Sequence, residues 1–267
     1  MKVISIEYHD VVDTGALDAS GFPGPGPGSY KLDTADFERH VAAISRVVAP
    51  GPGTVLDLLT AQSPRNTGAY FTFDDGGISA ATTIAPMLER FGWRGHYFVT
   101  TDRIGTPTFL DRDAIRDLVA RGHVIGSHSC SHPALMAHCS DAQLLDEWRR
   151  SVDVLQKILG APVLTASVPG GLYAPKVARA AAAAGIRALF TSQPVTRTTV
   201  VNGCLVLGRY SIRRRTPPEV AAALAAGHVS PRLKQWLERR VMTMARSLGG
   251  PLYLRVRSAV FARRGVE

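Results

Sequence analysis

The sequence predicts an α/β fold, a distorted or incomplete (β/α) barrel of about seven parallel strands with a basic helical C-terminal extension. From Ala69 onward, apolar strand-like segments alternate with amphipathic helical segments, an order that usually gives a parallel sheet covered by helices. A length of 267 residues suits a barrel that forms a single domain. Hydrophobic residues make up 45% of the chain and charged residues 20%, which excludes a disordered chain.

The expected elements follow the chain in a regular order. KVISIEY (2–8) is the first strand, and DTADFERHVAAISRVV (33–48) is a capped helix between two loops rich in glycine and proline, 21–30 and 49–53. The remaining strands are expected at 69–73, 95–100, 123–128, 162–168, 186–192 and 204–212. The intervening helices are expected at 81–92, 111–122, 141–160 and 174–185.

The positive charge is concentrated near the C-terminus. The net charge is +9, and the segment from Arg209 to Glu267 holds 13 lysines and arginines against three glutamates. We therefore divide the chain into a barrel, 1–230, and a basic amphipathic extension, 231–267, packed on or beside it. This extension either closes the barrel or lies on an anionic membrane surface. No nucleic-acid-reading motif accompanies the charge, so we expect no nucleic acid partner.

The cysteines and the N-terminal residues indicate the cellular compartment in which the protein is expected. MKVISIEYHDVV has neither a long apolar run nor a cleavage site of small residues, so it does not resemble a secretory signal. The three cysteines form no C-x-x-C pair, and their odd number is most easily explained by free thiols. We expect a cytoplasmic protein without disulfides, and its basic extension is compatible with a peripheral position at the inner membrane face.

Two segments carry residues suited to metal chemistry. FTFDDGG (71–77) ends a strand in Asp74 and Asp75, and HVIGSHSCSH (123–132) follows a strand with His128 and His132. If the second segment turns helically, histidines four apart converge on one ion. Each segment alone is equally compatible with an ordinary turn. Together, at the carboxyl ends of neighbouring parallel strands, they supply a carboxylate and two imidazoles to one face.

FTFDDG and SHSCSH together resemble the paired signature of the NodB-homology polysaccharide deacetylases, carbohydrate esterase family 4, over residues 70–211. The resemblance implies a hydrolase that removes an N-acetyl (N-acyl) group from an amino sugar in an oligo- or polysaccharide. It implies Asp74 as general base, and Asp75, His128 and His132 as ligands of one divalent metal. Zinc is expected, and cobalt, nickel and manganese are compatible with the same ligands.

Two departures from the family pattern change the expected roles. TASVPGGLY (165–173) carries Ser167 near the position of the usual arginine, so we expect Arg209 to steady Asp74 instead. The usual late Leu-x-x-His is missing. The early YHD (8–10) resembles the poly-N-acetylglucosamine deacetylase branch with shifted motif order, which implies His9 as the acid; Asp10 is alternatively a plain turn residue.

The remaining expectations concern contacts and partners. We expect Gly170, Gly171, Tyr173 and Arg209 to contact the substrate or its transition state. We expect structural roles for His96, His123 and His138. The substrate is expected in exopolysaccharide or cell-envelope glycan synthesis, and a lipid-linked form is compatible with that role. The alternative is an inactive deacetylase-like scaffold or binding protein in a polysaccharide assembly complex, which the missing arginine of the third motif favours.

Overall fold

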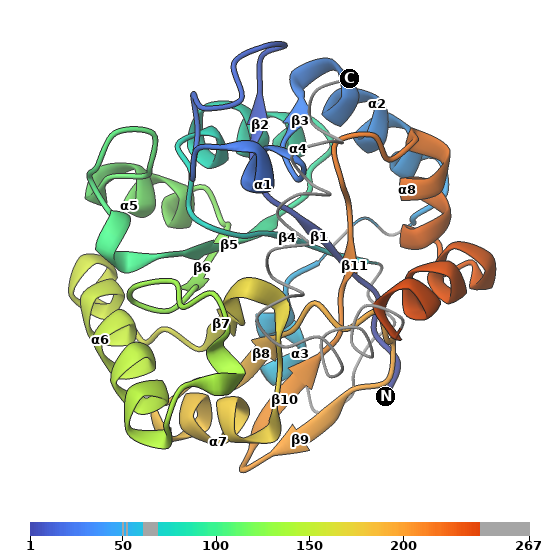
Figure 1. Ribbon diagram of the computed structural model, residues 1–267. Coiled ribbons are helices and arrows are strands. Elements are labelled where there is room, and N and C mark those ends of the chain that lie inside the picture. Colours follow the sequence, from blue (N-terminus) through green and yellow to red (C-terminus); the bar gives the residue numbers. More distant parts are fainter. Residues whose placement is uncertain (50, 52, 61–68, 241–267) are drawn as a thin grey trace.

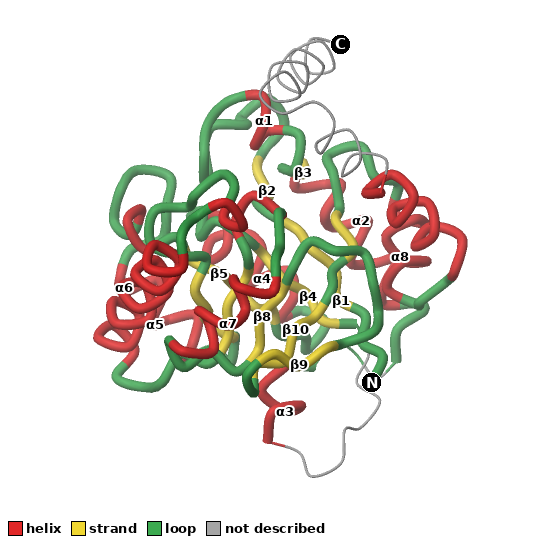
Figure 2. Tube along the Cα trace, turned by 60° about the horizontal axis from the view of Figure 1, so that its bottom comes forward, coloured by secondary structure: helices red, strands yellow, loops and turns green. Residues whose placement is uncertain are grey.

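The computed structural model describes residues 1–49, 51, 53–60 and 69–240. In this part of the chain, nine strands form one curled sheet, and the larger helices lie around it (Figure 1). A tilted view shows strands β1, β4, β8 and β10 grouped in the interior, with α5, α6 and α7 on one side and α2 and α8 on the other (Figure 2). The predicted distorted (β/α) barrel is confirmed.

The sheet has the order β11-β1-β4-β5-β6-β7-β8-β10-β9, and its paired neighbours are parallel except β10 with β9. Its strands are β1 (Ser5–Tyr8), β4 (Tyr70–Phe73), β5 (Gly95–Val99), β6 (Val124–Ser127), β7 (Thr165–Ser167), β8 (Ala188–Phe190), β9 (Thr199–Val201), β10 (Cys204–Leu207) and β11 (Tyr210–Ser211). A separate parallel pair joins β2 (Val11–Val12) to β3 (Leu32–Asp33).

The sheet has two strands more than the seven predicted, because β9 was not expected and the predicted strand 204–212 is split. Only Gly208 and Arg209 separate β10 from β11, yet β10 pairs with β8 and β11 pairs with β1 at the other end of the sheet. Three residue steps span about 11 Å at most, so the two ends of the sheet approach each other here. A side chain at Gly208 would collide with the carbonyl oxygens of Gln193 and Val195.

The helices fall close to their predicted positions. They are α1 (Pro25–Gly28), α2 (Thr34–Ser45), α3 (Val55–Thr60), α4 (Ala85–Glu89), α5 (Arg112–Ala120), α6 (Asp141–Leu159), α7 (Pro175–Ala183) and α8 (Pro218–Ala225). Shorter turns occupy Ala80–Ile84, Thr101–Arg103, Met136–His138 and Pro169–Gly171. The predicted loop 21–30 contains the one-turn helix α1, and α3 was not predicted. The predicted helix 81–92 is helical from Ala80 to Glu89, with a wide π turn over Ala80–Ile84 just before Pro86, which has no N–H for the helical hydrogen-bond ladder.

Helix α6, the longest in the described part of the chain, illustrates how local sequence sets the boundaries of an element. Ser140 and Gln143 form a capping box at its start, and Gly160 ends it in the left-handed conformation. Leu144, Trp148 and other apolar residues at helical spacing are buried on one face. That face packs the helix against the sheet, which places the loop after β6 next to α6.

The chain after α8 continues as a helix over residues 229–240. Gln235 fixes this helix to the barrel, since its Nε2 donates to the Ser211 carbonyl at 2.9 Å and its Oε1 accepts from the Ser211 N–H at 3.1 Å. Residues 241–267 lie outside the described residues, so most of the predicted extension 231–267 does as well. None of the described helices is long and apolar enough to cross a membrane.

Candidate active site

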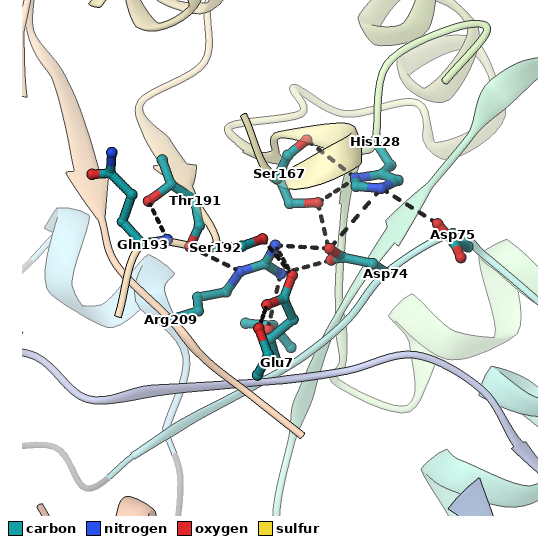
Figure 3. A network of polar contacts seen from close by, with 12 residues as sticks. Glu7, Asp74, Asp75, His128, Ser167, Thr191, Ser192, Gln193 and Arg209 are labelled. Carbon is teal, nitrogen blue, oxygen red and sulfur yellow. Dashed lines mark hydrogen bonds and ion pairs between the residues drawn. The ribbon is translucent and has the colours of Figure 1, made fainter. Parts of the chain in front are cut away.

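The residues singled out from the sequence gather at the carboxyl ends of parallel strands. Asp74 and Asp75 follow β4, His128 follows β6, and Ser167 ends β7, its neighbour (Figure 3). Strand β1 lies on the other side of β4 and carries Glu7 within the same network. The barrel therefore brings four segments that are far apart in the sequence to one edge.

Asp75, His128 and His132 form a compact donor set. The Asp75 Oδ1 atom lies 3.4 Å from the Nε2 atoms of both His128 and His132, and one ligand atom from each residue falls within 4.8 Å of the others. Burial raises the pKa of Asp75, but the neighbouring His128 and His132, together with His9, outweigh burial and hold it well below its usual value. A carboxylate and two imidazoles at this spacing fit a divalent metal with open positions.

The loop that carries the two histidines is not the helical turn we considered. Ser129 and His132 have positive φ angles of 65° and 62°, so the chain turns sharply instead of continuing as a helix. Glu147 of α6 holds this loop by accepting from the N–H groups of Cys130 and Ser131 at 2.9 and 2.8 Å and from the Ser131 hydroxyl at 2.5 Å. Sequence reasoning missed Glu147.

Asp74 does not belong to this donor set. It forms a buried ion pair with Arg209 instead. The guanidinium donates to Asp74 Oδ1 and Oδ2, each at 2.7 Å, and the Ser167 hydroxyl donates to Oδ1 at 3.0 Å. Burial raises the pKa of Asp74, but the charges of Arg209 and His128 outweigh burial and lower it to about 2. Asp74 is therefore ionised at neutral pH, and Oδ2 keeps an accepting position because Ser167 uses Oδ1.

Arg209 makes the contact with Asp74 that we expected from the sequence. Its side chain has no exposed surface, and a second carboxylate, Glu7 of β1, accepts from it at 2.9 Å. Glu7 is in turn held by the hydroxyls of Ser192 and Ser211. Sequence reasoning missed Glu7, although a carboxylate inside an apolar strand is itself a signal that a buried cation lies nearby.

Ser167 stands where the family arginine was expected and connects Asp74 to His128. Its hydroxyl has one proton, which must go to the Asp74 carboxylate, since a carboxylate can only accept. Towards His128 Nδ1, at 2.5 Å, the hydroxyl therefore accepts, so Nδ1 carries the ring proton. The lone pair of His128 is then on Nε2, the atom that faces Asp75, which is the state that a metal ligand requires.

Replacing Ser167 by alanine is expected to weaken metal binding by about 10-fold, because His128 Nδ1 loses the 2.5 Å contact with the hydroxyl and keeps only the 3.2 Å contact with the backbone carbonyl oxygen of residue 167. Ser167→Thr keeps the hydroxyl and is expected to stay near wild type. Competition with a fluorescent zinc chelator gives the dissociation constants. Equal constants for wild type and Ser167→Ala would show that the hydroxyl does not orient His128.

His9 follows β1 and lies on the same side of the strand as Glu7. Ligand atoms of Glu7, His9 and Asp74 fall within 4.8 Å of one another, and the His9 ring lies against Tyr30 with the centroids 4.8 Å apart. His9 Nδ1 is buried without a hydrogen-bond partner among the described residues. Its neighbour Asp10 instead binds the hydroxyls of Ser20 and Ser79, the turn-stabilising role that we had left open.

The expected substrate contacts are only partly brought together. Gly170 and Gly171 line the same cavity as Asp74 and His9, and both have positive φ angles, 65° and 68°. Tyr173 is not among the residues lining the cavity, because the chain turns after Gly171 and its side chain packs against the hydrophobic core. Arg209 does not line the cavity either, since its guanidinium is buried against Asp74 and Glu7. The contacts of Tyr173 and Arg209 with substrate therefore stay predictions.

Of the histidines expected to be structural, His96 and His123 lie in hydrogen bonds within the barrel, whereas His138 is exposed at the end of the short turn Met136–His138. His96 accepts from the Val55 N–H at 2.9 Å and its other ring nitrogen is 2.9 Å from the Phe71 carbonyl oxygen. His123 accepts from the Gly95 N–H at 3.1 Å and lies 2.8 Å from Glu89. Both are buried at the opposite end of the strands from the donor set. These contacts fit the structural roles expected for them.

The curled parallel sheet presents the donor set at its carboxyl edge, where (β/α) barrels usually carry their active sites. A family model described as polysaccharide deacetylase matches residues 61–189. The chain is 28% identical over 128 residues to a chitin deacetylase of Arthroderma benhamiae, a match that covers 47% of this chain and 32% of that protein. Residues 61–189 thus match the polysaccharide deacetylase domain, the family that the paired FTFDDG and SHSCSH signature resembles.

Solved structures share the fold. The deacetylase PplD of Streptococcus pyogenes, solved with acetate, superposes with a TM-score of 0.66 at 19% identity, over 82% of this chain and 96% of PplD. IcaB of Ammonifex degensii gives a TM-score of 0.66 at 20% identity, over 84% of this chain and 97% of IcaB. By contrast, this chain spans between 4% and 60% of the length of five curated relatives.

Proposed function

We propose that the chain is a metal-dependent hydrolase that removes an N-acetyl (N-acyl) group from an amino sugar in an oligo- or polysaccharide. One observation carries the proposal: a single cavity is lined by the Asp75–His128–His132 donor set, by the ionised Asp74 outside that set, and by His9. A chain that only bound metal would have no need for a second carboxylate fixed beside the ligands.

The residues of the site can divide the work of amide hydrolysis. A divalent metal held by Asp75, His128 and His132, zinc in the first place, would polarise the amide carbonyl and lower the pKa of water. Asp74 accepts the proton of the attacking water at Oδ2, which lies 4.0 Å from His128 Nε2 and so faces the donor set. Arg209 keeps this carboxylate ionised and fixed in position.

The leaving amine needs a proton, and His9 is placed to supply it. The ring of His9 lines the cavity and is held against Tyr30. The backbone of Gly170 and Gly171 borders the same space and offers close approach to an oxyanion. These assignments follow the poly-N-acetylglucosamine deacetylase branch that the YHD segment resembles.

The test is acetate release from N-acetylglucosamine oligomers, together with metal content. Asp74→Asn and His9→Ala are each expected to lower turnover by about 10²- to 10⁴-fold while metal content stays at the wild-type level. His138→Ala, at an exposed histidine outside the cavity, is the matched control. If wild-type protein with stoichiometric metal releases no acetate from any amino-sugar donor, the scaffold alternative replaces the enzyme. The Arg209–Asp74 contact weakens that alternative, because it supplies the missing arginine.

We further propose that the protein acts in the cytoplasm at the inner membrane face, in exopolysaccharide or envelope glycan synthesis. Its three cysteines are free, as in a reducing compartment. Helix 229–240 exposes Val229, Leu233 and Leu237 along one face, with exposed fractions of 65%, 50% and 50%, in a basic segment. Apolar and cationic side chains together favour an anionic lipid surface.

Co-sedimentation with vesicles tests the membrane contact. Wild-type protein is expected to bind vesicles that contain anionic lipid and to bind neutral vesicles less, because the segment is both apolar and basic. Leu233→Glu/Leu237→Glu is expected to abolish binding. The control Val200→Glu places a charge at another exposed apolar side chain and should bind as wild type. Equal binding by the double variant and wild type would remove this part of the proposal.

A further inference from the structure

The cavity that contains the donor set is larger than cleavage of one acetamido group requires. Its volume is about 1150 Å³, above the roughly 300–1,000 Å³ typical of sites for small ligands. Away from the donor set it is bordered by the loop after β11 and by one face of helix 229–240. Room for more than one sugar unit lies between the reacting groups and this outer wall.

The outer wall of the cavity is basic. It carries Arg213 and Arg215 from the loop after β11, and Lys234 and Arg239 from helix 229–240. Two carboxylates, Glu219 and Glu238, border the same region, so cations outnumber anions there by two. The carboxylates deeper in the cavity are Glu7, Asp74 and Asp75. They do not neutralise this wall, because each is already paired with Arg209 or with the site histidines.

Two of these cations have no carboxylate within ion-pair distance among the described residues. The guanidinium of Arg213 lies over the ring of Tyr30, 5.7 Å from its centroid, and the Tyr30 ring also contacts the ring of His9. Lys234 is exposed towards the cavity and makes no ion pair within the described chain. Arg213 is thus positioned by an aromatic side chain that also borders the reacting groups, while its hydrogen-bond donors remain available.

We propose that this wall, Arg213 with Lys234, is a subsite for an anionic group, a phosphate or a uronate carboxylate, on a sugar unit near the one that is deacylated. The inference rests on the proposed function and narrows its substrate class from amino-sugar glycans in general to acidic saccharides. A guanidinium and an ammonium together match the charge and the acceptor oxygens of such a group. Because cavity walls reduce the local dielectric, the attraction is stronger than it would be on open surface.

Isothermal titration calorimetry on the full-length, metal-loaded protein tests the subsite without requiring turnover. The probes are glucose 1-phosphate, glucuronate and neutral glucose. We expect both anionic sugars to bind tighter than glucose, and Arg213→Gln/Lys234→Gln to weaken them at least tenfold. Arg112→Gln/Arg149→Gln removes the same charge from exposed positions on α5 and α6 and should keep wild-type affinity. The stronger of the two anionic probes identifies the phosphate or the carboxylate as the preferred group.

If Arg213→Gln/Lys234→Gln binds the anionic sugars as tightly as wild type, the anion binds at the metal and the proposed subsite is overturned. Equal affinity of the wild type for charged and neutral sugars would overturn it too. If Arg112→Gln/Arg149→Gln loses as much affinity as Arg213→Gln/Lys234→Gln, the effect comes from the net charge of the protein, and the proposed subsite is overturned as well. Acetate release from neutral oligomers is measured separately. If the wall binds anions but the protein releases no acetate, the subsite is supported and the proposed function fails. If the protein releases acetate but the wall binds no anion, the proposed function is supported and the subsite fails.

Discussion

Replacement of Arg209 by methionine is expected to lower the free energy of unfolding by about 3–5 kcal/mol, the usual cost of removing one partner from a buried ion pair. The guanidinium is fully buried and serves two carboxylates, Asp74 at 2.7 Å and Glu7 at 2.9 Å. Without it, both carboxylates stay in a low-dielectric interior with no cation, and one of them must take up a proton or draw in water. Urea denaturation in the presence of a chelator measures the loss without a contribution from metal.

Three further variants separate this cause from simple loss of packing. Arg209→Lys keeps the charge but not the bidentate contact and should lose less stability than Arg209→Met. Arg209→Met/Asp74→Asn/Glu7→Gln removes both uncompensated charges and should regain part of the loss. Arg112→Met, at an exposed position on α5, should be near wild type. A triple variant less stable than Arg209→Met would show that packing, and not charge, dominates at this site.

Much of the fold was predictable because its signals are local. The alternation of strand and helix can be recognised within segments of about five to twenty residues, and this order predicts the parallel sheet. The positions of Asp75 and His128 were predictable for the same reason: each directly follows a buried strand, and parallel strands place their carboxyl ends at one edge. No knowledge of side-chain contacts was needed to bring the donor set together.

The part that was missed depends on contacts between residues far apart in the chain. Glu7 and Arg209 lie 202 residues apart, and their contact exists only because the chain changes partners at Gly208, from β8 to β1. Periodicity within 204–212 favours one continuous strand, so the break was not predicted. Ser167 was noticed as a missing arginine, but its double role between Asp74 and His128 requires three strand ends in register. The Tyr173 side chain packs against the core and not along the cavity. This could not be predicted, because the direction of a loop side chain is not encoded locally.

Replacement of His128 by alanine is expected to remove bound metal, since it leaves only Asp75 and His132 of the three ligands. Protein purified with excess zinc and then desalted should hold about one metal per chain as wild type and almost none as His128→Ala. His138→Ala is the control for removing a histidine, because that residue is exposed and outside the cavity. Elemental analysis by mass spectrometry gives the metal content directly.

The same variant should also lose the stabilisation that metal confers. A metal that binds only the folded state at a free concentration 100-fold above its dissociation constant stabilises by about 2.7 kcal/mol. For a chain of this size that corresponds to a rise in melting temperature of about 5–10 °C for wild type. We expect no such rise for His128→Ala and a full rise for Asp74→Asn, because Asp74 is held by Arg209 and Ser167 and not by the donor set. A wild-type rise in His128→Ala, or its loss in Asp74→Asn, would require a different set of ligands, with the Glu7–His9–Asp74 cluster as the next candidate.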